Sequence, residues 1–406
     1  MALDARRILA RCDALAAHSE QPDGLTRIFL SPQQRAVNEQ VLAWMREAGM
    51  QGRLDAIGNC VGRYEGTRAG LPCLMLGSHL DTVRDAGRYD GMLGVIAAIE
   101  CVAALGGKRL PFAIEVVGFG DEEGVRFGST LLGSRAVAGT FDSALLDKAG
   151  SDGVTLREAL RAFGLDPGAI GTAAHRRGDV LAYVELHIEQ GPVLEAEGLP
   201  VGVVTAINGG YRVMVEVAGV AGHAGTVPMS LRHDALVAAA ECVVAVERVA
   251  RDSRDVVGTV GRIEAQPGAM NVIPGRVRFS LDVRAPTDAQ RAAALDAMRA
   301  RFGAIAKARG VALALEPVWE ARTAICDARL QSQLAEAVRG EGVAVRHLPS
   351  GAGHDGMALV DIAPIGMLFV RCKGGISHNP AESVTEDDVA IGARVLLRFI
   401  ENFVAS

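Results

Sequence analysis

Two different patterns of apolar and polar residues divide the chain. Outside residues 210–325, continuous apolar runs such as LPCLMLGSHLDTV (71–83) and FAIEVVGFG (112–120) show little alternation, which predicts strands buried on both faces. Helical patterns lie beside them at 31–50, which begins at Ser31–Pro32, and at 89–107, which begins at Asp90–Gly91. Because strands alternate with helices, we predict an α/β fold with a mostly parallel central sheet.

Residues 210–325 follow the second pattern. YRVMVEVAGVAGHAG and GRVRFSLDVRA alternate apolar and polar positions, and DALVAAAECVVAVERVAR and TDAQRAAALDAMRARFGAIAKARG are long, Ala-rich helical segments. This combination predicts an α+β domain in which two helices cover one face of an antiparallel sheet. LFVRCKGGISHNPAE then returns to the buried-strand pattern. We therefore predict one domain formed by residues 1–209 and 326–406, with a second domain, 210–325, inserted into it. Motifs rich in histidine and carboxylate lie in the first, which we expect to be the catalytic, metal-binding domain.

Composition narrows the class of protein. The chain has 406 residues, of which 49% are hydrophobic and 22% charged, and a net charge of −6 without a basic block, so nucleic acid is not an expected partner. Its seven cysteines are scattered and form no CxxC, which suits a reducing compartment and gives no thiolate metal site. The N-terminus lacks the apolar core of a secretory signal, and no apolar run reaches the ~18 residues of a membrane span. We expect a cytoplasmic protein that does not contact a membrane.

Histidines and carboxylates gather where the buried strands are predicted to end. GSHLD carries His79, ELHIEQG carries His187, GISHNPAE carries His378, and the acidic run Asp121–Glu123 follows a buried strand. The alternatives are ordinary: a solvated acidic loop, an N-cap at Asp90, and an edge strand in ELHIEQG. Nitrogen and oxygen ligands without cysteine suit zinc, manganese or cobalt. More than four ligands, spread along the chain, suggest two metals sharing a bridging carboxylate.

The acidic run becomes understandable if a metal lies beside it. Adjacent Glu122 and Glu123 face different ways, so one can bind a metal while the other holds a water, and the metal's charge relieves their repulsion. His79 and Asp81, one residue apart on an extended segment, face the same side. A carboxylate there can hold the second ring nitrogen of a metal-binding histidine and fix its tautomer.

Eight motifs in order carry a resemblance to a known family: GSHLDTV, YDGMLGV, DEEGVRFGS, ELHIEQGPVLE, GHAGTVPM, NVIPGRVRFSLDVR, SGAGHD and GISHNPAE. The chain resembles, over essentially its whole length, the hydantoinase/carbamoylase branch of the M20 metallopeptidase family. That branch includes allantoate amidohydrolase, N-carbamoyl-L-amino acid hydrolase and β-ureidopropionase. Peptidase relatives carry a carboxylate at the position of His187, so the histidine, with Gln190 three residues on, favours hydrolysis of a ureido amide over peptide cleavage.

The resemblance implies a role for each motif residue. One divalent metal would be bound by His79, Asp90 and His187, and the other by Asp90, Glu123 and His378, with Asp90 bridging. Asp81 would orient His79, and Glu122 would be the general base and later the general acid. Substrate contacts would come from Gln190, His223, Asn271, Arg284, Gly353 and His354. The inserted domain would be a dimerisation and lid domain, and His223 would complete the site of the partner in a homodimer and polarise the scissile carbonyl.

The expected activity follows from these roles. We expect an amidohydrolase that cleaves the terminal ureido amide of a small carboxylate, releasing ammonia and carbon dioxide, with two zinc or manganese ions, or cobalt. Allantoate is the favoured substrate, on overall likeness that includes HSEQPDGLTR and RYDGMLGV. An N-carbamoyl-L-amino acid is the first alternative, and a peptidase or N-acyl amino acid deacylase is the next. A non-catalytic, metal-dependent binding protein is the alternative from another class, and the presence of Glu122 argues against it.

Overall fold

A computed structural model describes residues 3–405, so the two ends of the predicted domains, at residues 1 and 406, lie outside the described residues. The chain forms two compact units. Unit 1 contains the described residues up to Thr205, Cys326–Leu348, and the described residues from Ala352 on. Unit 2 contains Ala206–Ile325 and Pro349–Gly351. The assignment of 210–325 as an inserted lid domain stays a prediction.

The sheet of unit 1 has a parallel centre. Its strands run in the order β1 (Gln51–Leu54), β2 (Cys60–Tyr64), β4 (Ala113–Phe119), β3 (Cys73–His79), β5 (Val180–Ile188), β16 (Ile365–Val370) and β6 (Val201–Ile207). The pairs β4–β3, β3–β5 and β5–β16 are parallel, whereas β1–β2, β2–β4 and β16–β6 are antiparallel. The predicted parallel sheet is therefore confirmed for the four central strands, and antiparallel strands flank it on both sides.

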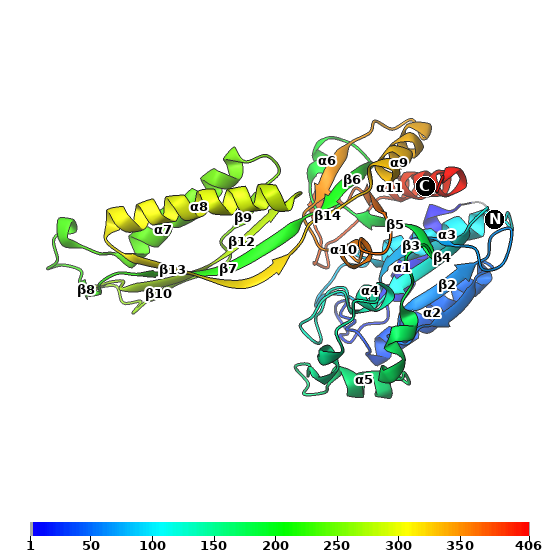
Figure 1. Ribbon diagram of the computed structural model, residues 1–406, viewed down its shortest axis with the longest axis horizontal. Helices are drawn as coiled ribbons and strands as arrows, with labels where there is room; N and C mark the ends of the chain where they lie inside the picture. The colour runs from blue at the N-terminus through cyan, green and yellow to red at the C-terminus, as the bar shows by residue number, and fades with distance from the viewer. Residues whose placement is uncertain (1–2, 406) are drawn as a thin grey trace. The chain divides into compact units, whose positions relative to one another are not determined.

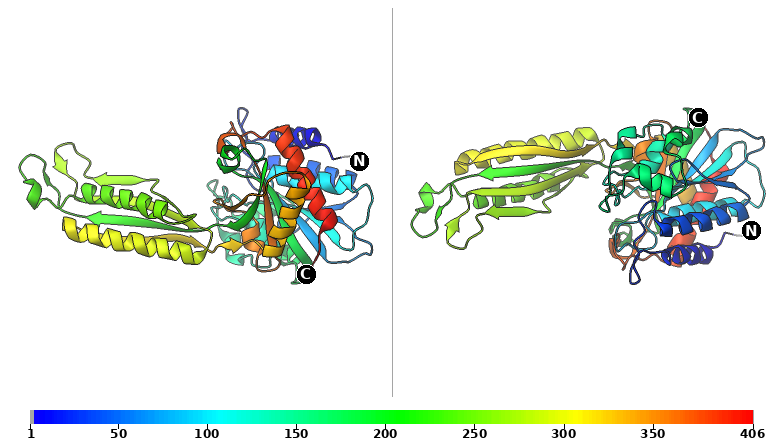
Figure 2. Two further views of the ribbon diagram at one scale, coloured as in Figure 1. Left: turned by 90° about the horizontal axis from the view of Figure 1, so that it is seen from above. Right: turned by 90° about the horizontal axis from the view of Figure 1, so that it is seen from below.

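Helices cover this sheet (Figures 1 and 2). Residues of α1 (Ala5–Ala16), α2 (Pro32–Glu47), α3 (Met92–Ala104), α9 (Ala328–Gly340) and α11 (Glu386–Asn402) share one hydrophobic cluster with the strands. The hydroxyl of Ser31 caps α2 as predicted, accepting the amide of Gln34 at 3.1 Å. Helix α3 is buried from Met92 to Val102, because its residues are apolar except for Glu100, which pairs with Arg7 and Arg11. A second cluster joins Phe29 and Ile57 to α4 (Leu132–Val137) and α5 (Leu156–Ala162).

Unit 2 is built on an antiparallel sheet. Strands β10 (Ile263–Gln266), β12 (Arg276–Ala285), β7 (Gly209–Ala218) and β13 (Ala312–Ala321) pair in that order, and β9 (Val257–Thr259) also pairs with β12. Helices α7 (Ala235–Asp252) and α8 (Asp288–Arg309) run along it. Alternate residues of β12, such as Phe279 and Leu281, pack with these helices, while Arg278 and Asp282 point to the other face. The predicted antiparallel sheet is therefore confirmed.

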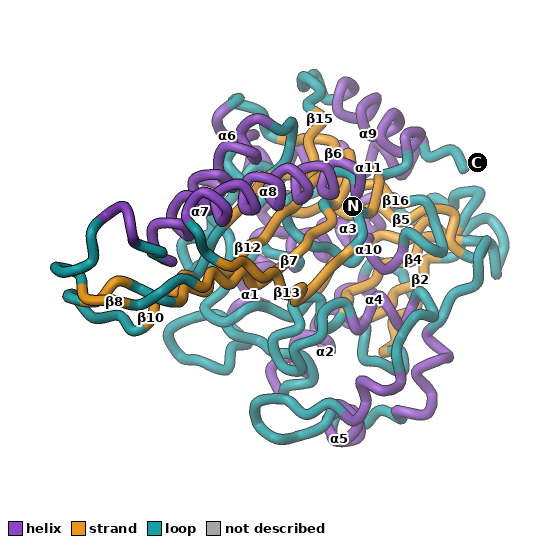
Figure 3. The backbone as a smooth tube through the Cα atoms, turned by 60° about the vertical axis from the view of Figure 1, so that its left-hand side comes forward, coloured by secondary structure: helices purple, strands orange, loops and turns teal. Residues whose placement is uncertain are grey.

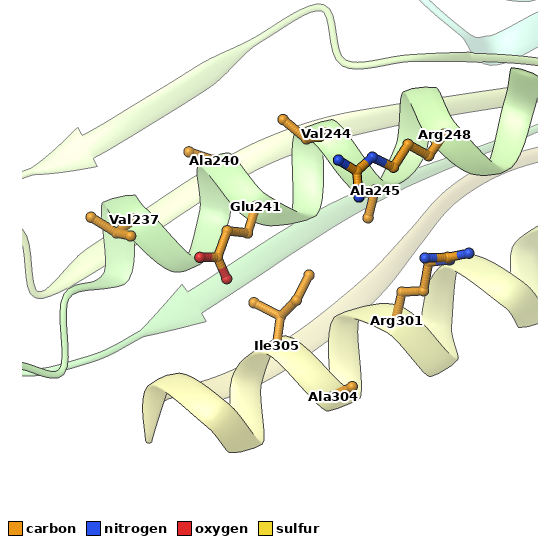
Figure 4. Close-up of a pocket in the computed structure, with 9 residues that line it drawn as sticks. All are labelled: Val237, Ala240, Glu241, Val244, Ala245, Arg248, Arg301, Ala304 and Ile305. Carbon is orange, nitrogen blue, oxygen red and sulfur yellow. The ribbon is translucent and has the colours of Figure 1, made fainter.

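Two features of unit 2 stand apart from its core. The short strands β8 (Gly222–His223) and β11 (Val272–Ile273) pair with each other, and β8 lies at one end of the unit (Figure 3). A groove of about 580 Å³ runs between α7 and α8, where Val237 and Val244 face Ala304 and Ile305 (Figure 4). No helix within residues 3–405 is long and apolar enough to cross a membrane.

Candidate metal centre

The central strands bring the motif residues to one edge of the sheet. His79 is the last residue of β3, His187 is the next-to-last residue of β5, and the acidic run follows β4 after one glycine. These strands are parallel, so their carboxyl ends meet at the same edge, where ligands bind in such sheets. His378 follows β16, which is parallel to β5. ELHIEQG is therefore part of a buried central strand, and the edge-strand alternative is wrong.

Asp90 lies between the histidines. Its Oδ1 is 3.5 Å from Nε2 of His79 and 3.1 Å from Nε2 of His187, and its Oδ2 is 3.2 Å from Nε2 of His378. Glu123 Oε1 lies 3.5 Å from the same His378 nitrogen. Each carboxylate oxygen of Asp90 thus faces a different set of ligands, which is the arrangement that a bridging carboxylate needs.

The helix after Asp90 does not use it as a cap. Gly91 is the N-cap of α3, and within the described chain no side chain caps this helix end. Gly91 has φ +76°, and a Cβ atom there would lie 2.6 Å from the imidazole of His79. Only glycine fits, because its backbone must turn directly against the ring. The ordinary N-cap alternative for Asp90 is wrong.

Hydrogen bonds fix the tautomers of two histidines. Nδ1 of His79 lies 3.0 Å from the carbonyl of Asp81, and Nδ1 of His187 lies 2.9 Å from the carbonyl of Ile188. A carbonyl only accepts, so each Nδ1 carries the proton. In the neutral rings, the Nε2 lone pairs therefore face the oxygens of Asp90.

Lone pairs that face one another repel unless a proton or a metal cation lies between them. Among the described residues, Asp90 Oδ1 and His187 Nε2 are buried and have no hydrogen-bond partner. Without a metal, a proton lies between the histidine and Asp90. Burial disfavours the charged imidazolium, but the Asp90 carboxylate stabilises it and raises the pKa of His79 well above its usual range. A divalent cation meets the same need, and histidine and carboxylate are ligands of zinc and manganese. The residues fit a metal.

The acidic run is buried. Asp121 is 1% exposed and Glu122 is 8% exposed, so the solvated-loop alternative is wrong. Burial raises the pKa of Glu122 well above its usual range and raises the pKa of Glu123 to about 7, while the charge of His79 opposes both shifts. Ligand atoms of His79, Glu122 and Glu123 lie within 4.8 Å of one another. Glu122 therefore reaches the centre from beside Glu123.

Asp81 acts differently from the prediction. The backbone carbonyl of Asp81 holds His79, whereas its carboxylate Oδ1 is 3.9 Å from His79 Nδ1. That carboxylate accepts the amides of Glu122 at 3.1 Å and Glu123 at 3.2 Å. The expected carboxylate–imidazole hydrogen bond is wrong because His79 Nδ1 faces the backbone carbonyl of Asp81 and lies 3.9 Å from its carboxylate. Asp81 shapes the acidic loop as well as orienting the histidine.

A sequence model of peptidase family M20/M25/M40 matches residues 75–402. The chain belongs to this family. It is 44% identical to an N-carbamoyl-L-amino acid amidohydrolase of Geobacillus stearothermophilus, over 97% of each chain. It is 40% identical to a probable allantoate deiminase of Oryza sativa subsp. japonica, over 96% of this chain and 87% of the relative. A crystal structure of a hydantoinase/carbamoylase family amidase from Burkholderia multivorans aligns with a TM-score of 0.92 at 34% identity, covering 98% of this chain and 97% of that one.

Membership of the M20 family confirms the expected branch and enzyme class. Relatives of this chain are named amidohydrolases, and it acts on carbon–nitrogen bonds other than peptide bonds. Enzymes of the M20 family use divalent metals, which agrees with the two groups His79–Asp90–His187 and Asp90–Glu123–His378, each with its ligand atoms within 4.8 Å. The roles of individual residues stay predictions.

Three predicted substrate residues lie in unit 1 near this centre. Gln190, which has φ +57°, donates from Nε2 to Asp90 Oδ2 at 3.1 Å and to Ser377 Oγ at 3.1 Å. Its Oε1 is buried and has no partner within residues 3–405. A Cβ atom at Gly353 would lie 3.6 Å from Glu122 Oε1. Gln190 and Gly353 are therefore within reach of a molecule bound at the metals.

His354 is buried against His187. It is 1% exposed, and its ring meets the ring of His187 edge-on at a centroid distance of 4.5 Å. Burial, followed by the charge of His187, lowers the pKa of His354 well below its usual range. Glu185 lies with these two histidines, but its carboxylate is engaged by Ser78 at 2.6 Å and Tyr183 at 2.9 Å. His354 therefore packs against His187, and its contact with the substrate stays a prediction.

The other three predicted substrate residues lie in unit 2. His223 and Asn271 are exposed neighbours, since Val272 pairs with His223 and Ala224 donates to the carbonyl of Asn271 at 2.9 Å. Arg284 lies eight residues along β12 from Arg276, the residue that begins the strand. At ~3.4 Å per residue this is about 27 Å. The structure brings His223 and Asn271 together, and it keeps Arg284 far from both.

Ser377 contacts the centre, although no role for it was predicted from the sequence. Its hydroxyl lies 3.2 Å from Asp90 Oδ2 and 3.0 Å from Glu382 Oε2. Both residues lie in the motif GISHNPAE, next to or near His378. The motif therefore contained both residues, but spacing within a loop does not predict which side chains turn toward a site.

Proposed function

We propose that this M20 enzyme hydrolyses the terminal ureido amide of a small carboxylate, with two divalent metals per subunit, and that allantoate is its substrate. The observation that carries the proposal is Asp90, whose two oxygens face His79 and His187 on one side and His378 on the other. Relatives named allantoate deiminase and N-carbamoyl-L-amino acid amidohydrolase support the ureido class. The 44% identity to the latter makes an N-carbamoyl-L-amino acid the second candidate.

The chemistry follows from the buried carboxylate beside the ligands. Bound divalent metals would lower the pKa of water from about 15.7 toward ~7 and polarise a carbonyl. Glu122 would take the proton of the attacking water and later deliver it to the departing nitrogen. Its burial supports this role, because a carboxyl group with a raised pKa holds a proton near neutral pH. The released carbamic acid would decompose to ammonia and carbon dioxide.

Gln190 would select the ureido group. Its amide nitrogen is held by Asp90 and Ser377, which leaves Oε1 buried and able only to accept. A terminal ureido NH₂ would donate to it. A peptide carbonyl or an acyl chain has no such donor at that place, and the buried oxygen would then remain unpaired at a cost of about 1–3 kcal/mol.

His223 would act in the site of a partner subunit. Asn271 precedes Arg276, the first residue of β12, and Arg284 lies about 27 Å along the strand from Arg276. A small ureido acid would therefore not touch both Asn271 and Arg284 of one chain. We propose that Arg284 binds the carboxylate in its own subunit, while His223 and Asn271 serve the partner's site in a homodimer. Exposed Met229, Leu231 and Met270 near them support such a contact.

A substrate panel tests the proposal. Ammonia release would be measured from allantoate, several N-carbamoyl-L-amino acids and dipeptides, before and after a chelator and after adding back zinc, manganese or cobalt. We expect chelator-reversible release from ureido acids, fastest with allantoate. Faster release from a carbamoyl amino acid would select the second candidate. Cleavage of dipeptides in preference, or no ammonia from any ureido acid, would reject the ureido class.

A further inference from the structure

Glu382 lies beneath the backbone of Asp90 and is 4% exposed. Its Oε1 accepts the amide of Tyr89 at 2.8 Å and the amide of Asp90 at 3.2 Å, and its Oε2 lies 3.0 Å from the hydroxyl of Ser377. These two amides directly precede helix α3. Because the start of a helix favours negative charge, Glu382 holds this turn by both hydrogen bonds and electrostatics.

Ser377 extends this connection to the side chain of Asp90. Its hydroxyl lies 3.2 Å from Asp90 Oδ2 and receives an N–H of Gln190 at 3.1 Å. The single hydroxyl proton goes to Glu382 or to Asp90, and either choice joins residues 377–382 to the proposed bridging ligand. At Gly87, a Cβ atom would lie 2.2 Å from Glu382 Cδ. The Glu382 side chain therefore rests directly on the backbone that leads into Asp90.

His378 depends on this connection more than the other two histidines do. The side chains of His79 and His187 are 3% and 1% exposed and are carried by strands of the central sheet. The side chain of His378 is 49% exposed, lies in a loop, and has φ +53°. Positive φ is costly for a residue with a side chain unless its surroundings impose it. Ser377, its immediate neighbour, and Glu382, four residues on, provide contacts that tie this loop to Asp90.

We propose that Glu382 is a positioning residue that fixes the separation between Asp90 and His378, and so sets the affinity of the metal site formed by Asp90, Glu123 and His378. The site formed by His79, Asp90 and His187 depends on it less, since β3 and β5 hold both histidines. The inference rests on the proposed pair of metals, and it links Glu382 to the binding affinity of one of the two ions.

The test measures metal content instead of activity. Wild type and Glu382→Gln holoenzyme would be dialysed against a series of chelator-buffered zinc concentrations, and bound zinc per subunit counted. Glutamine removes the negative charge beside the two amides that precede α3, and its NH₂ can only donate to Ser377 Oγ, not accept from it. We expect one of the two zinc ions to be lost at a free zinc concentration about 10–100-fold higher than in wild type, since partners of metal ligands have effects of that size. The other ion should shift by less than about threefold.

Glu189→Gln is the matched control. Glu189 is 8% exposed and also accepts two backbone amides, those of Val193 at 2.8 Å and Leu194 at 2.9 Å. Among the contacts of the described residues, none joins the Glu189 carboxylate to Asp90 or to the loop of His378. The control should therefore retain both zinc ions as wild type does, although it lies closer in sequence to His187 than Glu382 does.

Three results would overturn the inference: unchanged zinc binding in Glu382→Gln, equal weakening of both ions, or the same loss in Glu189→Gln. If Glu382→Gln does not fold, Gly87→Ala decides, because the new methyl group must displace Glu382 without removing its charge, and the same loss of one ion is expected. The zinc content of wild type also distinguishes failure of this inference from failure of the proposed function. Fewer than two zinc ions in wild type would reject the pair of metals itself, whereas the choice of substrate affects neither count.

Discussion

The two units hold their chemically important residues in opposite ways. In unit 1, His79, Asp90 and His187 are 1–3% exposed and contact one another or the backbone. In unit 2, His223 and Asn271 are exposed on a short two-stranded ribbon, and Arg284 is held only within its own unit, by Asp282 and the carbonyl of Gly351. The proposed metal centre is thus assembled within unit 1 alone, whereas the proposed roles of the unit 2 residues require contact with a substrate or with a partner subunit.

The largest expected effect is that of Glu122→Gln. The variant should lose about 10²–10⁴ in kcat, because it removes the proposed proton carrier, and it should keep its metals, because Glu123 is the proposed ligand. Ammonia release and metal content, measured on one preparation, check the two halves of the prediction. Simultaneous loss of a metal would mean that the two glutamates have exchanged roles.

His223→Ala comes next and tests whether the exposed residues act in a second subunit. Removing a group that stabilises a developing oxyanion costs about 10²–10³ in kcat. Mixing His223→Ala and Glu122→Gln homodimers should restore part of the activity once subunits exchange, since one of the two hybrid sites then has both residues. Exchange would be followed with labelled subunits. Proven exchange without recovered activity would place His223 in the site of its own chain.

Arg284→Ala should have a smaller effect, confined to substrates with a carboxylate. Arg284 uses Nε and Nη2 on Asp282 at 3.1 and 3.2 Å and Nη1 on Gly351, which leaves one N–H on each Nη for a ligand. Loss of hydrogen bonds to a charged group costs about 1.5–3 kcal/mol, so KM for a ureido acid should rise about 10–150-fold.

The corresponding ureido amide is the control substrate for Arg284→Ala. Its KM should change little, because it carries no charge for the guanidinium to meet. Asp282→Asn should give a weaker version of the same pattern, since it loosens Arg284 without removing it. Equal changes in KM for the acid and its amide would remove the proposed role of Arg284.

The same contrast explains what the sequence could predict. The proposed ligands His79, Asp90, Glu123 and His187 lie at or beside the ends of regular elements, so the strand pattern alone places them on one edge of the sheet. The contacts of Asp81, Ser377 and Glu382 depend on how loops turn, and no periodicity specifies that. The burial of His354 behind His187 also follows from tertiary packing. In unit 2 the alternation of β12 predicted the sheet correctly, but the motifs did not indicate that Asn271 precedes the first residue of this strand while Arg284 lies near its last.

The smallest expected effect is on stability, and it belongs to unit 1 alone. In the metal-free protein, burial raises the pKa of Glu123 from 4.5 to about 7, so the folded state binds more protons than the unfolded chain between these values. Stability from this group is therefore fully present at low pH and is lost as pH rises through about 7. Metal binding needs deprotonated ligands, so the affinity for metal increases over the same pH range.

The melting temperature of metal-free protein should be higher at pH 5.5 than at pH 8, and added zinc should raise it more at pH 8, by about 2–4 °C for each kcal/mol. Glu123→Gln should flatten both dependences, whereas His223→Ala, on the exposed ribbon of unit 2, should leave both unchanged. A pH dependence that survives in Glu123→Gln and disappears in His223→Ala would reverse the contrast between the two units.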